Sequence, residues 1–259
     1  MKSHLEQKIN GTYKNKWFIS YRNITLAVNE RTSIFCILPF VGCSNSNPVI
    51  IFDNNYFLLY SCLFSSLCSL TFDYLARQKI GGNNFCHFIF EQLPVIPPNR
   101  YTSADLAFIV PRVLELTYTA WDIKAFADDV WRDADDSMKT LLRQQSEENT
   151  AVTGGHEWAP PEWAEIDPDG IPLPPFKWDE DRRAVLRAEL DALYARLYGL
   201  TRDELRYILD PADVYGPDFP GETFRVLKEK EIKKYGEYWT RRLVLEAWDR
   251  MGGRDRVQR

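Results

Sequence analysis

The segment Asn54–Phe72 carries no charged residue, is rich in leucine and phenylalanine, and is bracketed by Asp53 and Asp73. It is too long for a strand, so it predicts a helix. Its length approaches the roughly 20 residues of a membrane span. However, serines and asparagines interrupt it, and such interruptions favour a buried core helix over a membrane span. We expect one long helix over about residues 55–79, ended by the glycine pair at 81–82.

The residues before this helix predict short strands. Trp17–Tyr21, Ile24–Val28 and Ile34–Leu38 are rich in β-branched and aromatic residues, turn-prone pieces separate them, and Val49–Phe52 forms a fourth strand. Aromatic side chains in strands are usually part of a core. These residues and the long helix predict an α+β fold, with a small mixed sheet packed on the helix.

The remainder of the chain predicts helices separated by one long loop. Residues 148–177 hold six of the fifteen prolines and show no periodicity, which indicates a loop or linker. Thr201 and Glu204 have the spacing of a capping box. The expected helices cover about residues 104–118, 121–131, 133–148, 179–200, 202–209, 222–235 and 238–251. We therefore expect three parts, residues 1–102, 103–178 and 179–259, of which the last is a helical C-terminal region.

The net charge of −5 hides a gradient along the chain. Residues 1–100 hold 9 Lys and Arg against 5 Asp and Glu, whereas residues 101–178 hold 6 against 15. A phosphate-binding face is therefore expected in the first hundred residues. The five cysteines form no CxxC pair, and the N-terminus lacks the apolar region of a secretory signal. These features predict a cytoplasmic protein with reduced thiols and no metal site.

Four patches of the sequence resemble one family, and they occur in the order expected for it. The first is WFISYRNITLAVNERTSIFCILPF, residues 17–40, and the second is LFSSLCSLTFDYLARQKIGG, residues 63–82. The third is EQLPVIPP, and the fourth is the tail LYGLTRDELRYILDP with FPGETFRVLKEKEIKKYGEYWTRRLVLEAWDRM. The four patches together resemble the C-terminal target-recognition region of class I adenine-N6 DNA methyltransferases, of the type IIG restriction-modification or BREX- and DISARM-associated kind.

The resemblance implies a specificity segment of a phage-defence enzyme. In such enzymes a Rossmann-like catalytic module lies upstream and binds S-adenosylmethionine. The expected partners are therefore double-stranded DNA and a methyltransferase catalytic module, either upstream in the same chain or separate. No membrane partner is expected.

The chain lacks the chemical features of the catalytic module itself. No glycine-rich turn follows a strand, so no cofactor-binding residue is assigned. The nearest match to the Asn/Asp/Ser-Pro-Pro-aromatic motif is Leu173–Phe176, whose leucine has no oxygen to accept a hydrogen bond from a flipped adenine. Pro217-Asp218 with Glu231 and Lys233 matches a nuclease pattern, but chance matches are common in a charged helix. We assign no catalytic residue and no metal ligand.

Basic residues near turns and helix ends are the candidates for contact with DNA. They are Lys14, Lys16, Arg22, Arg31, Arg77, Lys79 and Arg100. Arginine can read guanine through two hydrogen bonds, and both residue types bind phosphate. Two structural alternatives are open: Arg77 and Lys79 complement the C-terminal dipole of their helix, and Arg31 pairs with Glu30 or with a buried carboxylate such as Asp73.

A second class of function competes with DNA recognition. The middle segment holds 6 basic against 15 acidic residues, and the chain lacks the complete catalytic motifs of the family. Both features are also typical of a non-catalytic protein-assembly module. On this alternative the chain is an assembly module or a degenerate methyltransferase fragment, and its helical tail docks on partner subunits.

Overall fold

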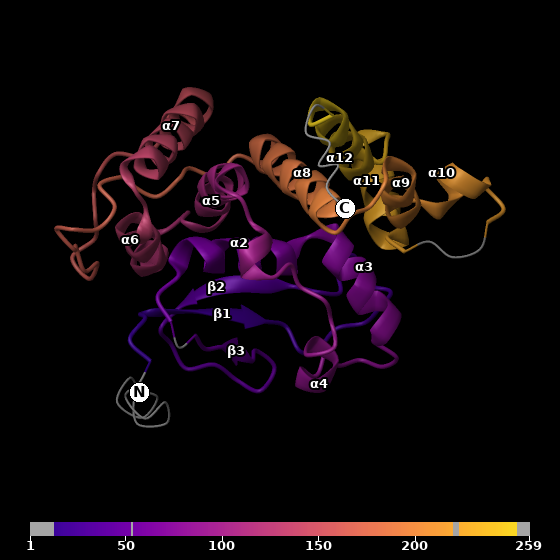
Figure 1. Ribbon diagram of the computed structural model, residues 1–259, viewed down its shortest axis with the longest axis horizontal. Helices are drawn as coiled ribbons and strands as arrows, with labels where there is room; N and C mark the ends of the chain where they lie inside the picture. Colours follow the sequence, from indigo (N-terminus) through magenta and orange to yellow (C-terminus); the bar gives the residue numbers. More distant parts are fainter. Residues whose placement is uncertain (1–12, 53, 220–222, 253–259) are drawn as a thin grey trace. The chain divides into compact units, whose positions relative to one another are not determined.

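The computed structural model describes residues 13–52, 54–219 and 223–252, and it has the expected α+β fold (Figure 1). The chain forms two compact units, each assembled from separate stretches of sequence. Unit 1 comprises residues 1–23, 34–65 and 97–179, and unit 2 comprises residues 24–33, 66–96 and 180–259. The two units agree with the expected three-part division only at the boundary near residue 179.

A three-stranded sheet lies in unit 1. Its central strand β1 (Trp17–Tyr21) pairs with β2 (Phe35–Pro39) on one side and with β3 (Val49–Ile50) on the other, and both pairings are antiparallel. Ile19 lies opposite Ile37 and Ile50 in the two registers. Every residue of β1 is buried, as its central position requires. The sheet is antiparallel throughout, so the expectation of a mixed sheet was wrong.

The segment Ile24–Val28 was expected to be a strand, and it is not one. Ile24 makes an isolated bridge to Asn84, and the residues that follow form a turn within unit 2. Side chains donate hydrogen bonds to the carbonyl groups that a neighbouring strand would otherwise have bonded. Thr32 Oγ1 donates to Leu26 O at 2.9 Å, and Arg77 donates to Ala27 O at 2.7 Å. A strong β propensity is therefore overridden by tertiary hydrogen bonds.

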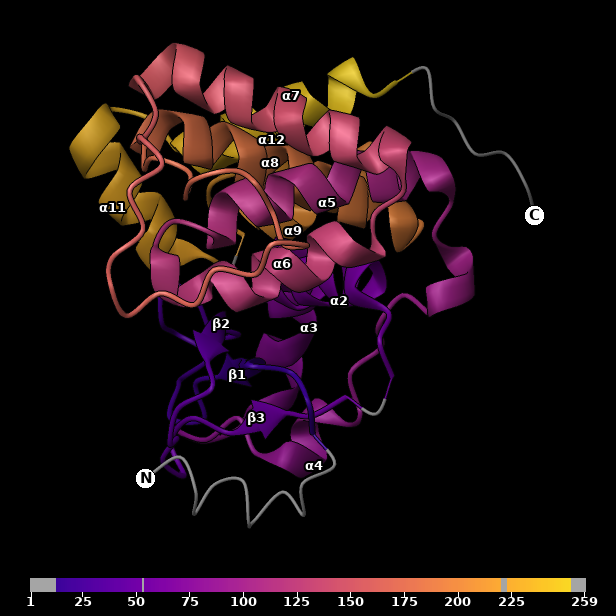
Figure 2. The same ribbon diagram turned by 90° about the vertical axis from the view of Figure 1, so that its left-hand side faces the viewer.

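Unit 1 contains several helices, including two that begin at a side-chain cap. The elements are the first part of α2 (Phe57–Cys68), η1 (Pro98–Arg100), α5 (Ser103–Thr117), η2 (Trp121–Ile123), α6 (Lys124–Asp133) and α7 (Asp136–Thr153). Thr102 and Asp105 form a capping box at the start of α5, and Asp135 accepts from Met138 N at the start of α7. Helices α5 and α7 lie side by side (Figure 2).

Trp17 anchors the core of unit 1. Its side chain is fully buried, and its ring meets Phe126 of α6 with the ring centroids 4.8 Å apart. The indole Nε1 donates a 2.7 Å hydrogen bond to Asp129 Oδ2. Tyr21 is also buried. Both residues are thus core residues, as expected for aromatic side chains in strands.

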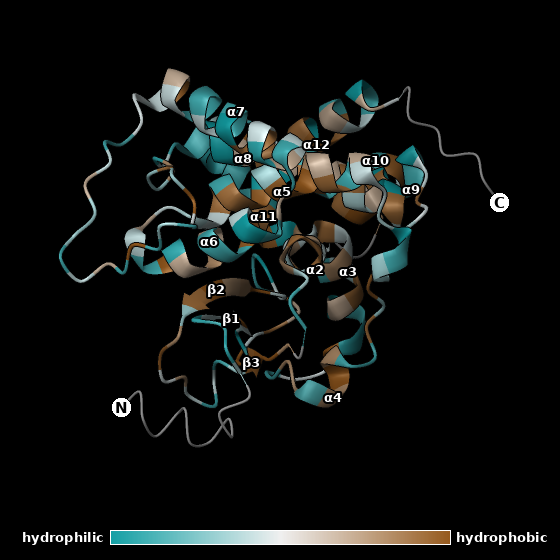
Figure 3. Cartoon of the chain, turned by 60° about the vertical axis from the view of Figure 1, so that its left-hand side comes forward, coloured by the Kyte–Doolittle hydropathy of each residue, from teal (hydrophilic) through white to brown (hydrophobic). Residues whose placement is uncertain are grey.

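The proline-rich loop of unit 1 runs from residue 154 to residue 179 and packs against the helices before it. Ile171 N donates to Asp128 Oδ1 at 2.9 Å, and Phe176 N donates to Tyr118 O at 2.8 Å. Tyr118 OH in turn donates to Leu173 O at 3.2 Å. Figure 3 shows this segment as a mainly hydrophilic trace with few apolar positions. Residues 173–176, Leu-Pro-Pro-Phe, therefore hold the loop against Tyr118 at the end of α5.

The long helix expected over residues 55–79 is two helices, α2 and α3 (Leu70–Lys79), separated at Ser69. The Ser69 hydroxyl accepts from Phe72 N at 3.2 Å and donates to Ser66 O at 2.7 Å. Serine hydroxyls compete in this way with helical hydrogen bonds, so the cap starts a second helix. Within the described residues no single helix combines the length and apolar composition of a membrane span; α2 and α3 meet that test only when taken together as a bent pair.

Unit 2 is otherwise helical. Besides α3 it contains α4 (His87–Phe90), α8 (Glu180–Leu197), α9 (Arg202–Leu209), α10 (Pro211–Tyr215), α11 (Arg225–Tyr235) and α12 (Trp239–Arg250). Helices α8 and α12 make the most extensive helix pair in the unit and run next to each other in Figure 1. The predicted capping box at Thr201 and Glu204 is present at the start of α9.

Replacing Thr201 with alanine removes this cap. Thr201 Oγ1 accepts from Glu204 N at 3.2 Å, and the Glu204 carboxylate accepts from Thr201 N at 2.7 Å. We expect Thr201→Ala to lower the free energy of unfolding by about 1 kcal/mol, because a helix N-terminus loses its side-chain acceptor. Urea unfolding followed by circular dichroism measures this difference.

Thr140→Ala is the matched control. Thr140 lies on the exposed surface of α7, where its hydroxyl only donates back to Asp136 O at 2.8 Å. Alanine is the better helix former at such a position, so the control should be neutral or slightly stabilising. Equal losses in the two variants would contradict the role given to the cap.

Candidate functional site

The guanidinium group of Arg77 connects several segments of unit 2. It makes five hydrogen bonds, one for each of its N–H groups. The acceptors are Asp73 Oδ1 at 3.1 Å and the carbonyl oxygens of Ala27 and Thr223 at 2.7 Å, Asn29 at 2.8 Å and Glu30 at 3.0 Å. The guanidinium also lies over the Phe224 ring, 4.5 Å from its centroid. Arg77 thereby joins α3 to two distant stretches of chain.

Asp73, one turn before Arg77 on α3, is fully buried and receives hydrogen bonds from the same loop. Its carboxylate accepts from Thr32 N at 3.1 Å and from Ser33 N at 3.4 Å. It also forms an ion pair with Arg31 Nε at 2.6 Å. The predicted alternative in which Arg31 pairs with the buried Asp73 is therefore confirmed. These donors and the ion pair offset the free-energy cost of moving the Asp73 carboxylate out of water.

Arg31 is held by a further contact and by a second carboxylate. Its Nη2 donates to Cys68 O. Burial alone would lower the pKa of Arg31, but the negative charges of Asp73 and Asp191 outweigh it and raise that pKa. Arg31 is therefore a fixed cation that joins the Glu30–Thr32 turn to α3.

Tyr198, at the end of α8, links two further pieces of unit 2. Its hydroxyl donates to Pro94 O at 2.9 Å and shares a 3.2 Å hydrogen bond with Ser66 Oγ. Asp191, two turns earlier on α8, accepts from Leu70 N at 2.6 Å at the start of α3. These hydrogen bonds and those of Arg77 and Asp73 connect members of all four sequence patches that carry the methyltransferase resemblance.

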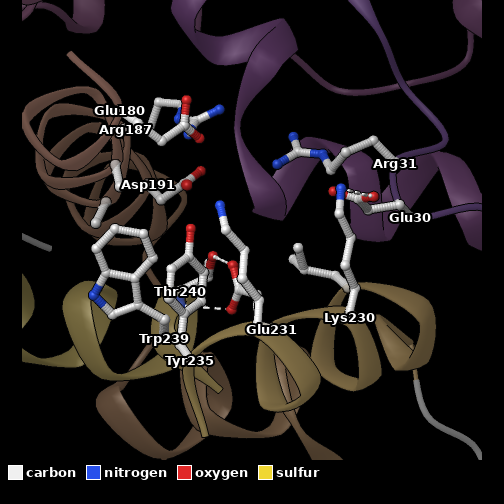
Figure 4. Close-up of a pocket in the computed structure, with 14 residues that line it drawn as sticks. Glu30, Arg31, Glu180, Arg187, Asp191, Lys230, Glu231, Tyr235, Trp239 and Thr240 are labelled. Carbon is white, nitrogen blue, oxygen red and sulfur yellow. Dashed lines mark hydrogen bonds and ion pairs between the residues drawn. The ribbon is translucent and has the colours of Figure 1, made fainter. Parts of the chain in front are cut away.

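A pocket of about 290 Å³ opens beside this network (Figure 4). Its walls come from the Glu30–Arg31 turn, α8, α11 and the first residues of α12. The polar and aromatic lining residues are Glu30, Arg31, Glu180, Arg187, Asp191, Lys230, Glu231, Lys234, Tyr235, Trp239 and Thr240. In Figure 4 the Asp191 side chain reaches into the space between α8 and the Glu30–Arg31 turn.

The charges around this pocket are largely paired with one another. Lys230 Nζ lies 2.7 Å from Glu30, and Arg187 lies 3.8 Å from Glu180. Lys234 lies over the Tyr235 ring at 4.6 Å. Because the walls hold four basic and four acidic residues, the pocket does not select strongly for an anionic ligand such as phosphate.

Glu231, the carboxylate of the weak nuclease pattern, has a structural role. It is buried, and it accepts from Thr240 Oγ1 at 2.6 Å and from Thr240 N at 2.8 Å. Both of its oxygens therefore cap the first turn of α12. Among the described residues no group of three or more histidine, cysteine, aspartate or glutamate side chains is placed to hold a metal ion.

The predicted DNA-contact residues fall into three classes. Lys14, Lys16, Arg22 and Arg100 are exposed in unit 1, where Lys16 pairs with Glu165 of the proline-rich loop, and Lys79 is exposed in unit 2. Arg31 and Arg77 are brought together by Asp73 inside unit 2. Arg77 has no donor left for a phosphate or a base, so the expectation that it contacts DNA is corrected to an internal role.

Sequence reasoning missed two residues that organise this unit, Asp191 and Tyr198. Asp191 lies on α8 and Tyr198 directly follows it, and the predicted apolar face of this helix included neither of them. Their partners are backbone groups far along the chain, at Leu70 and Pro94. The sequence signal available for Asp191 was its place between Leu190 and Leu193 on a buried helical face, where a carboxylate needs a partner.

Comparison of the chain with protein-family models, with curated proteins and with solved structures gave no match.

Replacing Arg77 with lysine keeps the charge but removes the planar group with five donors. Lysine has three donors at one point, so it cannot serve acceptors spread over Asp73 and four carbonyl groups. Several buried acceptors lose their partner, and we expect the free energy of unfolding to fall by about 3 kcal/mol. Urea unfolding measures the loss.

Arg225→Lys is the control for this substitution. Arg225 lies on the exposed face of α11, where it pairs with Glu229 at 3.2 Å. A surface pair of this kind contributes little, so the change should be within about 0.5 kcal/mol. A tolerated Arg77→Lys variant would show that the five hydrogen bonds are not needed in solution.

Asp191 predicts a dependence of stability on pH. Burial raises its pKa from 3.8 to about 6; Arg31, the Leu70 N–H group and Arg187 oppose this rise, and Asp73 adds to it. The folded state thus binds the proton more tightly than the unfolded state. The contribution of this residue is most favourable below about pH 4 and declines as the pH rises towards 6, by up to about 3 kcal/mol in total.

Asp191→Asn isolates this effect, because asparagine retains an oxygen for Leu70 N but does not titrate. We expect the stability of the unaltered protein, measured relative to this variant, to fall between pH 4 and pH 6. Parallel unfolding curves across this range would show that burial of Asp191 does not perturb its titration.

Proposed function

We propose that this chain is a DNA target-recognition segment of an adenine-N6 DNA methyltransferase or of a restriction-modification enzyme in phage defence. It selects or grips double-stranded DNA and does not itself transfer the methyl group. The catalytic module that binds S-adenosylmethionine is supplied upstream or as a separate partner. A cytoplasmic location follows from the proposal, because a bacterial restriction-modification enzyme meets its DNA there.

The meeting of residues from all four resemblance patches within unit 2 carries this proposal. The patches are scattered along the chain, yet their polar residues meet in one hydrogen-bonded network. Arg77 binds the carbonyl groups of Ala27 and Thr223, and Tyr198 contacts Ser66 and Pro94. A chance likeness of short patches would not be expected to coincide with the residues that hold a compact unit together. The coincidence supports a shared architecture.

The exposed basic residues supply the chemistry for DNA. Lys14, Lys16, Arg22 and Arg100 are exposed in unit 1, and Lys79 is exposed in unit 2. Such side chains bind phosphate and release counterions, which supplies affinity without sequence preference. A chain with net charge −5 repels DNA elsewhere on its surface, so binding is expected to be confined to these basic positions.

A protein-assembly role is the second candidate, and one observation in unit 1 favours it. Trp163 is 65% exposed and Ile166 is 44% exposed on the proline-rich loop, next to acidic residues such as Glu165. Exposed apolar side chains beside charges are typical of a protein interface. Size-exclusion chromatography with light scattering, in the presence of the catalytic module, tests this role through Trp163→Ser.

The proposal predicts DNA binding that weakens as salt rises. Fluorescence anisotropy with a labelled duplex, at several salt concentrations, gives the slope of log affinity against log salt. We expect Lys14→Gln with Arg22→Gln to weaken binding to all sequences and to reduce the slope by about 2 when both residues contact phosphate. The measurement is made with the chain alone and with the chain joined to its catalytic module.

Arg225→Gln with Lys233→Gln is the matched control, since it removes two positive charges from the exposed face of α11. It should leave the slope unchanged. Binding that does not depend on salt, or no binding even when the catalytic module is joined, would reject the proposed function. An equal effect of both pairs would show that net charge alone governs the interaction.

A further inference from the structure

The loop that follows α3 is exposed but fixed at both of its ends. Residues 81–84, Gly-Gly-Asn-Asn, are all exposed, whereas Ile80 before them and Phe85 after them are buried. Thr25 N donates to Asn83 O at 3.1 Å, and Asn84 bridges to Ile24. All of these residues belong to unit 2. The loop is therefore a short projection that the core of unit 2 holds in place.

Neither glycine is needed by the fold of the chain. Neither Gly81 nor Gly82 has a backbone φ in the left-handed region that favours glycine. A Cβ atom added at either position would meet no atom within 4 Å. Alanine would therefore fit both positions and would lose less conformational entropy on folding. The intramolecular reasons for glycine, special dihedral angles and close packing, are both absent here.

One further use of glycine is to let a ligand approach the backbone closely, and this use requires neither a special φ nor tight packing within the chain. Gly199 and Gly236 show the contrast, since both have a φ near +80°, at 82° and 79°, which explains them without a ligand. At Gly81 and Gly82 the missing side chains leave the backbone open to a partner.

The side chains around the glycine pair are suited to nucleic acid. Lys79 is exposed just before the loop and can bind phosphate. Asn83 and Asn84 are exposed, and Asn84 Nδ2 donates to Asn83 Oδ1 at 2.9 Å, which orients the two amides together. An asparagine amide pairs with adenine in the major groove by donating to N7 and accepting from the N6 amino group. One amide–amide hydrogen bond leaves further donors and acceptors on this pair for a base edge.

We propose that Lys79–Asn84 is the base-reading loop of unit 2: Gly81 and Gly82 admit the duplex to the backbone, and Asn83 and Asn84 read an adenine edge. This inference rests on the proposed function and names the surface that would discriminate sequences. The negative end of the α3 dipole lies at this loop, and Arg77 and Lys79 in its last turn offset that charge. Phosphate contact at this end therefore depends on Lys79.

The test is a double substitution, Gly81→Ala with Gly82→Ala, in the full chain joined to its catalytic module. Stability should be unchanged or slightly raised, because the added methyl groups meet nothing and the unfolded chain loses freedom. Affinity for a duplex selected from a random pool by the unaltered protein should fall about tenfold or more. Anisotropy gives the affinity, and urea unfolding gives the stability of the same samples.

Gly199→Ala is the control with the opposite pattern. Its φ of +82° strains alanine, so stability should fall while affinity for DNA stays the same. Asn83→Asp is the specificity variant, because it keeps the size of the side chain but replaces an amide donor with a negative charge. We expect it to relax or change the base preferred at one position, as read by selection from the random pool.

The outcomes separate this inference from the proposed function. If the unaltered protein binds no DNA, the proposed function fails, and the inference fails with it. If it binds DNA and the double alanine variant binds equally well, only the inference is overturned. If the variant binds DNA normally but, as a separate chain mixed with the catalytic module, no longer associates with it in light scattering, the loop is a protein contact, and the inference is again overturned.

Discussion

The five hydrogen bonds of Arg77 are the interaction on which the architecture of unit 2 depends. They tie α3 to the loop at Ala27–Glu30 and to the chain at Thr223, and Asp73 completes the arrangement by binding Thr32 and Arg31. A buried guanidinium is tolerated only because each of its donors has an acceptor. The irregular path of residues 24–33 follows from this requirement, since the loop must present several carbonyl groups to one planar group.

This arrangement separates two uses of positive charge. Arg31 and Arg77 stabilise the interior, whereas Lys79 and the basic residues of unit 1 remain at the surface. Recognition elements are commonly loops carried on a rigid scaffold. In unit 2 the Gly-Gly-Asn-Asn loop follows directly from the helix that Asp73 and Arg77 anchor. The same helix thus connects the interior network to the surface that we propose to read DNA.

Basic residues that look alike in the sequence have different roles in the structure. Contacts with distant parts of the chain decide which role each residue has. The pairing of Arg31 with Asp73 could be anticipated, because a carboxylate at the border of an apolar helix needs a cation. The internal role of Arg77 could not, because one of its acceptors lies at Thr223, 146 residues away in the chain. Exposure of Gly81 and Gly82 was likewise invisible in the sequence, where the pair had the position of an ordinary helix stop.

The sequence by itself determined the α+β class, the strand Trp17–Tyr21, most of the helices and the capping box at Thr201, because propensity, periodicity and capping act over a few residues. The tertiary structure alone decided the two discontinuous units, the break at Ser69 and the turn in place of a strand at Ile24–Val28. These features depend on which distant group satisfies each backbone carbonyl, and that choice exists only once the chain is packed.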